Sequence, residues 1–219
     1  MNRSFQPAYN ELLSEPDNVE IIRDQIAALL VLDLQNQYEL AVQEGASDAD
    51  DYKMAVYLED TDPLQWLDED DESCPFPLVN ILLDGADPDK GTASVNKQAN
   101  IARFFLDVYA GGNDAEGDYS KAAALKVWKA ARLVRRILRA EPNTYLRLRG
   151  VVGSVSFKFQ AYDPNRPQSA IRVKIVRITL EVSYVEDVAI TQGVIDWEIN
   201  GIITDENGHV LVGEGEKNE

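Results

Sequence analysis

The sequence is poor in the residues that most enzyme active sites use. Its 219 residues include one histidine, His209, and one cysteine, Cys74. A single cysteine excludes a disulfide framework within the chain and is typical of a protein made in a reducing compartment. Cys74 follows an acidic run, which disfavours the thiolate that a nucleophile requires. His209 directly follows an Asn-Gly pair and has no expected catalytic partner, so we interpret it as a residue that flanks a turn.

The short motifs that mark cofactor and metal sites are also missing. The sequence contains no GxxxxGK[ST] loop, no GxGxxG, no GxSxG and no zinc-ligand spacing. Its acidic clusters, "DADD", "DTD", "DEDDE" and "DGADPD", lack the alternating spacing and distal glutamate of a calcium loop. The sequence therefore predicts a protein that is not an enzyme and that binds no cofactor and no metal.

Long apolar runs and positive charge are scarce as well. The longest apolar stretch, "IAALLVLDL", is too short to span a bilayer, and the first sixteen residues have no apolar core typical of a secretory signal. Only 21 lysines and arginines accompany 38 aspartates and glutamates, which gives a net charge of −17. Nonspecific binding to nucleic acid depends on neutralising phosphates, so this balance argues against it. We expect a soluble protein made in the cytoplasm, with no membrane contact.

What is present indicates one α+β domain at 17–187, preceded by an N-terminal arm at 1–16 and followed by a C-terminal extension at 188–219. A first helix is expected from Asp17 or Asn18 to Gly45, because apolar residues recur there at helical spacing behind a capping residue.

Strand patterns fill most of the remaining domain. They are expected at 53–59, 76–84, 99–110, 150–162 and 170–186. In the last of these the apolar residues change phase near Val176, and we expect a β-bulge that places both sets on one face. The prediction is a mixed, mainly antiparallel sheet with two helices packed on one face. A C-terminal β-hairpin is expected around the Asn207-Gly208 turn.

A basic segment, "KAAALKVWKAARLVRRILRAE" at 121–141, stands out in this acidic chain. It carries seven basic side chains and one acid, a third of all the lysines and arginines. The segment is the predicted second helix, with Ser120 as its N-cap and Pro142 as its stop. At 100° per residue, small apolar residues form one stripe, whereas the basic residues share the opposite arc with Leu125 and Trp128.

The opposite charge is concentrated at 44–72, which holds twelve acids and one base. Three interpretations of the basic segment stay open: a solvated helix face, a phosphate-binding surface, or an interface with another protein chain. Segregation of opposite charges favours the third, because identical copies could dock basic helix against acidic region. The interface residues that we predict are Trp128, Lys129, Arg132, Arg135, Arg136, Arg139, Glu59, Asp60, Asp62, Trp66, Asp68 and Trp197.

Five stretches, in order over roughly 18–187, resemble the tail terminator (tail-completion) proteins of long-tailed bacteriophages. The sequence is similar to that family in its first helix, the strand after the first acidic loop, the strand before the second helix, that helix with its following turn, and the last long strand. The stretches are "IIRDQIAALLVLDLQNQYELA", "PFPLVNILLDGA", "IARFFLDVYAGG", "AARLVRRILRAEPNTYLRLRGVV" and "VRITLEVSYVE". The acidic insertion around 59–75 and the hairpin after Asp187 are longer than in a minimal member.

The resemblance implies a non-enzymatic virion protein with two helices packed on a mixed sheet. Six copies would form a ring at the head-proximal end of the tail tube, stop tube polymerisation and offer a docking face to the head connector or stopper. The implied partners are further copies of the chain, the tail tube protein and the connector, with the tail sheath as a further contact. Genomic DNA would pass through an acidic channel without specific binding, and the protein would be assembled in the host cytoplasm and reside in the neck of the tail.

Other interpretations stay open. The chain could be another neck component, such as a head-completion or connector-stopper protein. It could bind nucleic acid through the basic segment, in which case its affinity for DNA would fall steeply with salt. A metal-dependent hydrolase would need carboxylates that converge in space. The sequence does not distinguish a contractile from a non-contractile tail.

Overall fold

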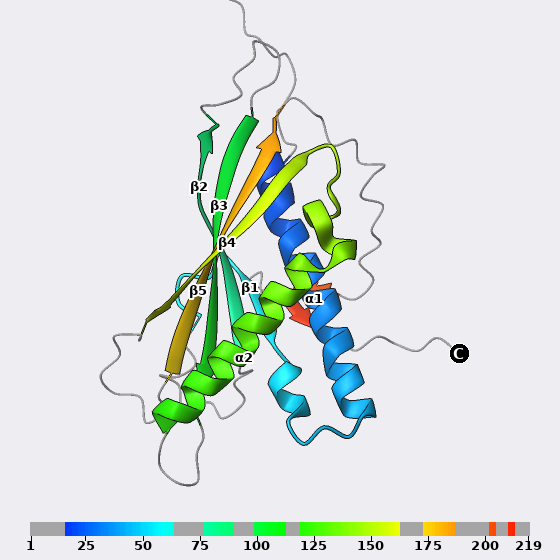
Figure 1. Cartoon of the computed structure of the whole chain (residues 1–219), viewed down its shortest axis with the longest axis vertical. Coiled ribbons are helices and arrows are strands. Elements are labelled where there is room, and N and C mark those ends of the chain that lie inside the picture. Colours follow the sequence, from blue (N-terminus) through cyan, green and yellow to red (C-terminus); the bar gives the residue numbers. More distant parts are fainter. Residues whose placement is uncertain are drawn as a thin grey trace, which may run out of the picture.

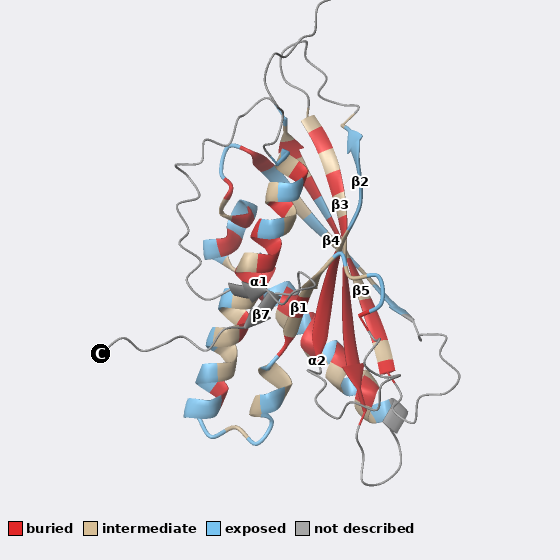
Figure 2. Ribbon diagram, turned by 180° about the vertical axis from the view of Figure 1, so that it is seen from behind, coloured by how far each residue is buried: buried red, intermediate tan, exposed pale blue. Residues whose placement is uncertain are grey.

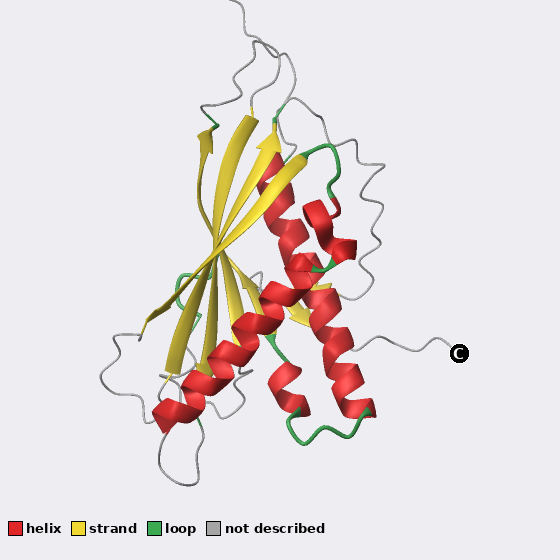
Figure 3. Cartoon of the chain, viewed as in Figure 1, coloured by secondary structure: helices red, strands yellow, loops and turns green. Residues whose placement is uncertain are grey.

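The chain folds into an α+β structure, as the sequence predicts. The computed structural model describes residues 16–63, 77–89, 99–112, 119–162, 173–186, 202–204 and 210–212, the last two ranges through their backbone alone. In chain order its elements are α1 (Asn18–Gln43), η1 (Ala49–Tyr52), β1 (Ala55–Leu58), β2 (Leu78–Pro88), β3 (Ala99–Gly111), α2 (Tyr119–Arg139), η3 (Glu141–Arg147), β4 (Val152–Tyr162), β5 (Val173–Val185), β6 (Ile202–Thr204) and β7 (Val210–Val212). Figure 3 shows the helices gathered on one side of the twisted sheet.

The sheet is mixed and mainly antiparallel, with the strand order β4-β5-β3-β2-β1-β7-β6. Only β1 and β2 run parallel among the neighbouring pairs that are described, and β3 pairs along its whole length with β5. β6 and β7 pair antiparallel as a hairpin, and β7 meets β1 at Val56. The predicted Asn207-Gly208 turn of this hairpin lies outside the described residues.

The first helix begins and ends where the sequence predicts. Asp17 is the N-cap: its carboxylate accepts hydrogen bonds from the backbone N–H groups of Val19 and Glu20, and the Glu20 side chain accepts one from the Asp17 N–H in return. The helix ends at the C-cap Glu44, and Gly45 takes a positive φ of 67° that favours glycine. α2 begins one residue before the predicted cap, so Ser120 lies inside its first turn.

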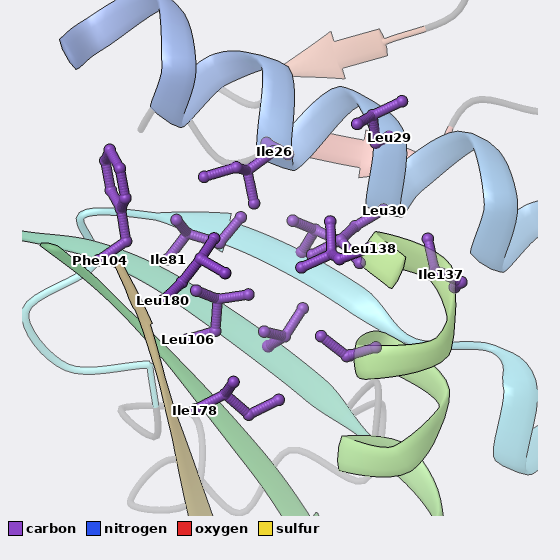
Figure 4. Close-up of a cluster of buried hydrophobic side chains, with 14 of the residues drawn as sticks. Ile26, Leu29, Leu30, Ile81, Phe104, Leu106, Ile137, Leu138, Ile178 and Leu180 are labelled. Atoms are coloured by element: carbon purple, nitrogen blue, oxygen red, sulfur yellow. The ribbon is translucent and has the colours of Figure 1, made fainter. Parts of the chain in front are cut away.

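The core lies between the two helices and one face of the sheet (Figure 1). Alternate residues of β3 point into it, and Phe104 and Leu106 are fully buried there. Figure 4 shows these side chains meeting Ile26 and Leu30 of α1 and the last turns of α2. Each Å² of apolar surface buried in this core contributes about 25 cal/mol to stability. This burial is the main interaction that holds the helices on the sheet.

The bulge predicted near Val176 is wrong. β5 keeps an unbroken antiparallel register with β3 from Val173 to Val185. Val173 and Ile175 therefore point to the face opposite the helices, where they form a second small cluster with Leu78 and Tyr109. The phase of the apolar residues changes because the sheet is buried on both faces at this end, as the buried lower halves of β3 and β5 in Figure 2 illustrate.

Candidate interface on the basic helix

The basic segment forms α2, which packs on β3 and β5 through the predicted stripe. Ala123, Val127, Ala131 and Val134 are buried against the sheet, and the small alanines let the helix backbone lie close to it. On the opposite arc, Leu125 is 66% exposed and Trp128 is 48% exposed, although apolar side chains of this size are usually buried. The helix thus presents two large apolar side chains to solvent beside its arginines.

The four arginines of α2 form two pairs, each spaced by one helical turn. Arg132 and Arg136, which we call the groove pair, line a hollow between α1 and α2. Arg135 and Arg139, which we call the edge pair, point the other way, toward β4. All four side chains are exposed, and within the described ranges only the edge pair forms cation–π contacts.

The edge pair covers the aromatic residues of β4. The guanidinium of Arg135 lies 5.2 Å from the ring centre of Phe159, and that of Arg139 lies 5.9 Å from Phe157. These cation–π contacts contribute on the order of 0.5–1 kcal/mol each. β4 is the last strand at this end of the sheet order, and Lys158 at its middle is a charge of the kind that protects an edge strand from pairing with other chains.

The groove between α1 and α2 has a volume of about 340 Å³. Its apolar surface comes from Leu133, Ile137 and neighbouring alanines of α2. Its polar residues are Asp33 and Gln37 of α1, Asp51 and Tyr52 of η1, and Lys129, Arg132 and Arg136 of α2. No hydrogen bond or ion pair joins either arginine of the groove pair to another residue in the described part of the chain.

Lys129 behaves differently from the arginines, because its partners lie in its own chain. Its Nζ lies 2.6 Å from an Asp48 oxygen and 3.1 Å from an Asp51 oxygen, and 4.5 Å from the ring centre of Tyr52. Burial lowers the pKa of Lys129, but the hydrogen bonds to the two carboxylates outweigh burial and raise the pKa above its ordinary value. The same lysine lowers the pKa of Asp48. Lys129 therefore fixes η1 on α2 and is engaged within the subunit.

Asn143 joins three elements, α1, α2 and η3, beside the groove residues Asp33 and Ile137. Its Nδ2 donates to Asp33 Oδ2 at 2.7 Å and to the Ile137 carbonyl at 2.8 Å, and its Oδ1 accepts from Arg147 Nε at 2.9 Å. These bonds support the left-handed backbone that follows, where Tyr145, Leu146 and Arg147 have φ between 52° and 58°. Each left-handed residue costs about 1–2 kcal/mol, so this turn depends on Asn143 and on the fully buried Leu146.

The acidic region divides between two sides of the molecule. Asp48 and Asp51 lie next to α2. The turn after β1, residues 59–62, begins at Glu59, which is close to Arg23 of α1, and continues on the side of the sheet away from the helices (Figure 1). We call 59–62 the acidic turn.

Hydrogen bonds hold the acidic turn on β2. The buried Asn80 donates to the Asp60 carbonyl at 2.7 Å and accepts from the Asp60 N–H at 3.3 Å. Glu59 accepts a hydrogen bond from the Leu83 N–H and lies 3.6 Å from Arg23 of α1. The N–H of Asp62 donates to an Asp60 carboxylate oxygen at 2.9 Å. The acidic turn therefore has a defined conformation.

Three predicted interface residues, Trp66, Asp68 and Trp197, lie outside the described residues. Of the others, the structure brings Trp128 and the arginines together on α2 and places Glu59, Asp60 and Asp62 away from them. Asn143, Tyr52 and the pairing of Lys129 with Asp48 and Asp51 were not predicted from the sequence. The spacing of Asp48 and Asp51 could have indicated a shared partner, because one helical turn brings residues three apart to the same side.

Within the described ranges, no three His, Cys, Asp or Glu side chains converge in a way that could hold a metal ion. None of the described helices is both long and apolar enough to cross a membrane. No known protein-family model matches the chain, and the curated proteins include no match to it.

Proposed function

We propose that this protein is a structural subunit of a bacteriophage tail that forms a ring, with six copies as the expected number, at the head-proximal end of the tail tube. In this role the ring stops tube polymerisation and provides the docking face for the head connector or stopper. The role is not enzymatic, and it requires the protein to bind copies of itself, the tail tube and the connector.

One observation carries the proposal: the exposed arginines of α2 and the later part of the acidic turn, from Asp60 to Asp62, lie on opposite sides of the sheet. Two surfaces of this kind can join identical copies head to tail, and such contacts close into a ring when the rotation between copies permits. The exposed Trp128 between arginines fits the composition of interface anchors. The fold supports the proposal as well, since two helices on one face of a mixed sheet is the architecture that the resemblance implies.

The overall charge fits a passage for DNA. A net charge of −17 repels phosphates, and a channel wall of that sign leaves the duplex free to slide. In this account the arginines of α2 serve between subunits rather than on the wall of the channel. The tail sheath is a further expected contact if the tail is contractile.

Electron microscopy of tail tube assembly tests the proposal. Purified protein added to the cognate tube protein should produce tubes with a ring at one end, and tubes capped early should stay short. A second structural role is a connector-stopper or head-completion protein, which would add to filled heads and leave isolated tubes uncapped. Tubes of unchanged length and without rings, together with protein bound to heads, would assign the chain to that role instead.

A further inference from the structure

The groove pair consists of two arginines that have no ion pair with any described residue, and both line a concave site. Three cations, Lys129, Arg132 and Arg136, and two carboxylates, Asp33 and Asp51, line the groove. Lys126 and Lys129 pair with Asp51, whereas Asp33 accepts a hydrogen bond from the neutral amide of Asn143 and keeps its charge. The two positive charges of Arg132 and Arg136 exceed the one negative charge of Asp33, so the net charge left for a bound partner is positive.

We propose that this groove binds the acidic stretch 66–72, "WLDEDDE", of a second copy of the chain. The inference rests on the proposed function, because it identifies the contact by which copies would join. The occupant follows from charge and shape. The groove offers two guanidinium groups above an apolar surface, and the stretch offers two apolar residues followed by five acids.

The spacing of charges on the two partners is compatible. Arginines at i and i+4 of a helix have Cβ atoms about 5–6 Å apart. Alternate residues of an extended peptide point to the same side and lie about 6.5–7 Å apart. A bound stretch in extended form would present Trp66, Asp68 and Asp70 together, with the indole against the apolar surface beside Leu133. Each carboxylate would then reach one guanidinium, which is the donor best shaped to receive it.

The position of the acidic turn favours a partner in a second copy over the same subunit. Residue 64 continues from the acidic turn, which lies on the side of the sheet away from α2 (Figure 1). Thirteen residues connect Pro63 to Pro77, so the middle of this connection can reach at most about 25 Å from its ends. From that side of the sheet, contact with the groove of a neighbouring copy does not require the chain to pass around its own sheet.

Fluorescence anisotropy with a labelled peptide of residues 64–76 tests the inference. The acceptor is the full chain with Asp68→Asn, Glu69→Gln, Asp70→Asn, Asp71→Asn and Glu72→Gln, which removes the competing charges of its own stretch. The peptide should bind this acceptor, and its affinity should fall with increasing salt. Adding Arg132→Glu and Arg136→Glu to the acceptor should weaken binding by about tenfold or more.

A matched control on the same helix separates a local from a general charge effect. Arg135→Glu with Arg139→Glu changes the net charge equally but lies on the flank toward β4, so peptide affinity should change by no more than about twofold. Equal affinities for the two variants would overturn the inference, as would equal binding of a peptide whose acids are replaced by amides.

The mass of the wild-type assembly distinguishes this inference from the proposed function. Rings that form without any peptide binding would overturn the groove contact and leave the ring in place. If instead the wild-type chain is monomeric but the groove substitutions still weaken peptide binding, the ring is overturned and the groove remains a site for acidic peptides.

Discussion

The two faces of the sheet share the same strands but are stabilised by different interactions. On the face toward the helices, Phe104 and Leu106 are fully buried among apolar neighbours. On the other face, Phe105 and Asp107 lie beside Arg177, whose guanidinium is 4.1 Å from the Phe105 ring centre and bonds both Asp107 oxygens at 2.6–2.7 Å. Alternation along one strand therefore separates an apolar core from a polar surface.

This difference determines which surfaces are available for assembly. On the helix side, the apolar stripe of α2 packs into the core, and the arginines of α2 are exposed to solvent. Among the described residues, the face away from the helices carries ion pairs, such as Arg103 with Asp84 and Glu181, beside the small buried cluster around Leu78 and Tyr109. A sheet with its helices on one face can thus display one charge pattern on the helices and another on the strands.

The largest difference in stability is expected between variants of two neighbouring phenylalanines, Phe104 and Phe105, whose side chains lie on opposite faces of the sheet. Phe104→Ala removes a fully buried ring from the core and should lower the free energy of unfolding by about 3–5 kcal/mol. Phe105→Ala removes a partly exposed ring and one cation–π contact, and should cost about 1–2 kcal/mol. Urea unfolding of both variants measures the difference. Equal losses would show that the face away from the helices is as tightly packed as the core.

Asp107 should be the most important polar residue of the face away from the helices. Its side chain is 3% exposed, and Asp107→Ala leaves the Arg177 guanidinium without this partner. We expect a loss of about 2 kcal/mol, below the usual cost for a fully buried pair because Arg177 is 31% exposed. The matched control is Glu181→Ala, an exposed partner of Arg103, which should cost less than about 0.5 kcal/mol. A thermal melt in which both variants lose the same stability would contradict this ranking.

A smaller loss of stability is expected at Lys129, which forms ion pairs on the helix side of the sheet. Lys129→Ala should cost about 0.5–1 kcal/mol, since the lysine holds η1 on α2 through two carboxylates. Because its pKa is raised in the folded state, the contribution of Lys129 is complete below its ordinary pKa and is lost as pH rises through the folded value. The pKa of Asp48 is lowered, so the contribution of that carboxylate is complete above its ordinary pKa and is lost as pH falls through the folded value.

The difference in stability between wild type and Lys129→Ala should therefore stay constant from about pH 5 to pH 9 and shrink on both sides of that window. Denaturant unfolding across this range measures it. A difference that instead stayed constant down to about pH 2 would show that the lysine acts through packing rather than through its ion pairs.

Much of the fold follows from local patterns in the sequence. Period-2 strands, the capping box at Asp17 and the apolar stripe of α2 are short-range signals, and the structure confirms the elements that they predict. The bulge failed because apolar residues on both phases also arise when a strand is buried on both faces, a fact about its neighbours in space. The spacing of Asp48 and Asp51 indicates that both carboxylates lie on one side, but their pairing with Lys129 depends on the tertiary fold.

The candidate interface was accessible from the sequence only in part. Helical periodicity places Trp128 and the arginines on one arc, and the structure agrees. The division of those arginines into a groove pair and an edge pair depends on where α1 and β4 lie beside α2, which requires the tertiary fold. Asn143 was missed because a buried asparagine between three elements leaves no local pattern.

Native mass spectrometry of charge-reversed variants tests the central claim that opposite charges on identical copies close a ring. Wild-type protein should appear as a ring of defined mass that dissociates as salt increases, and Arg132→Glu with Arg136→Glu should shift it to monomers at the same concentration. The strongest support would come from a variant that combines Arg132→Glu and Arg136→Glu with lysine in place of the acids at 68–72 and that forms rings again. An unchanged ring mass for the arginine variant would contradict the account.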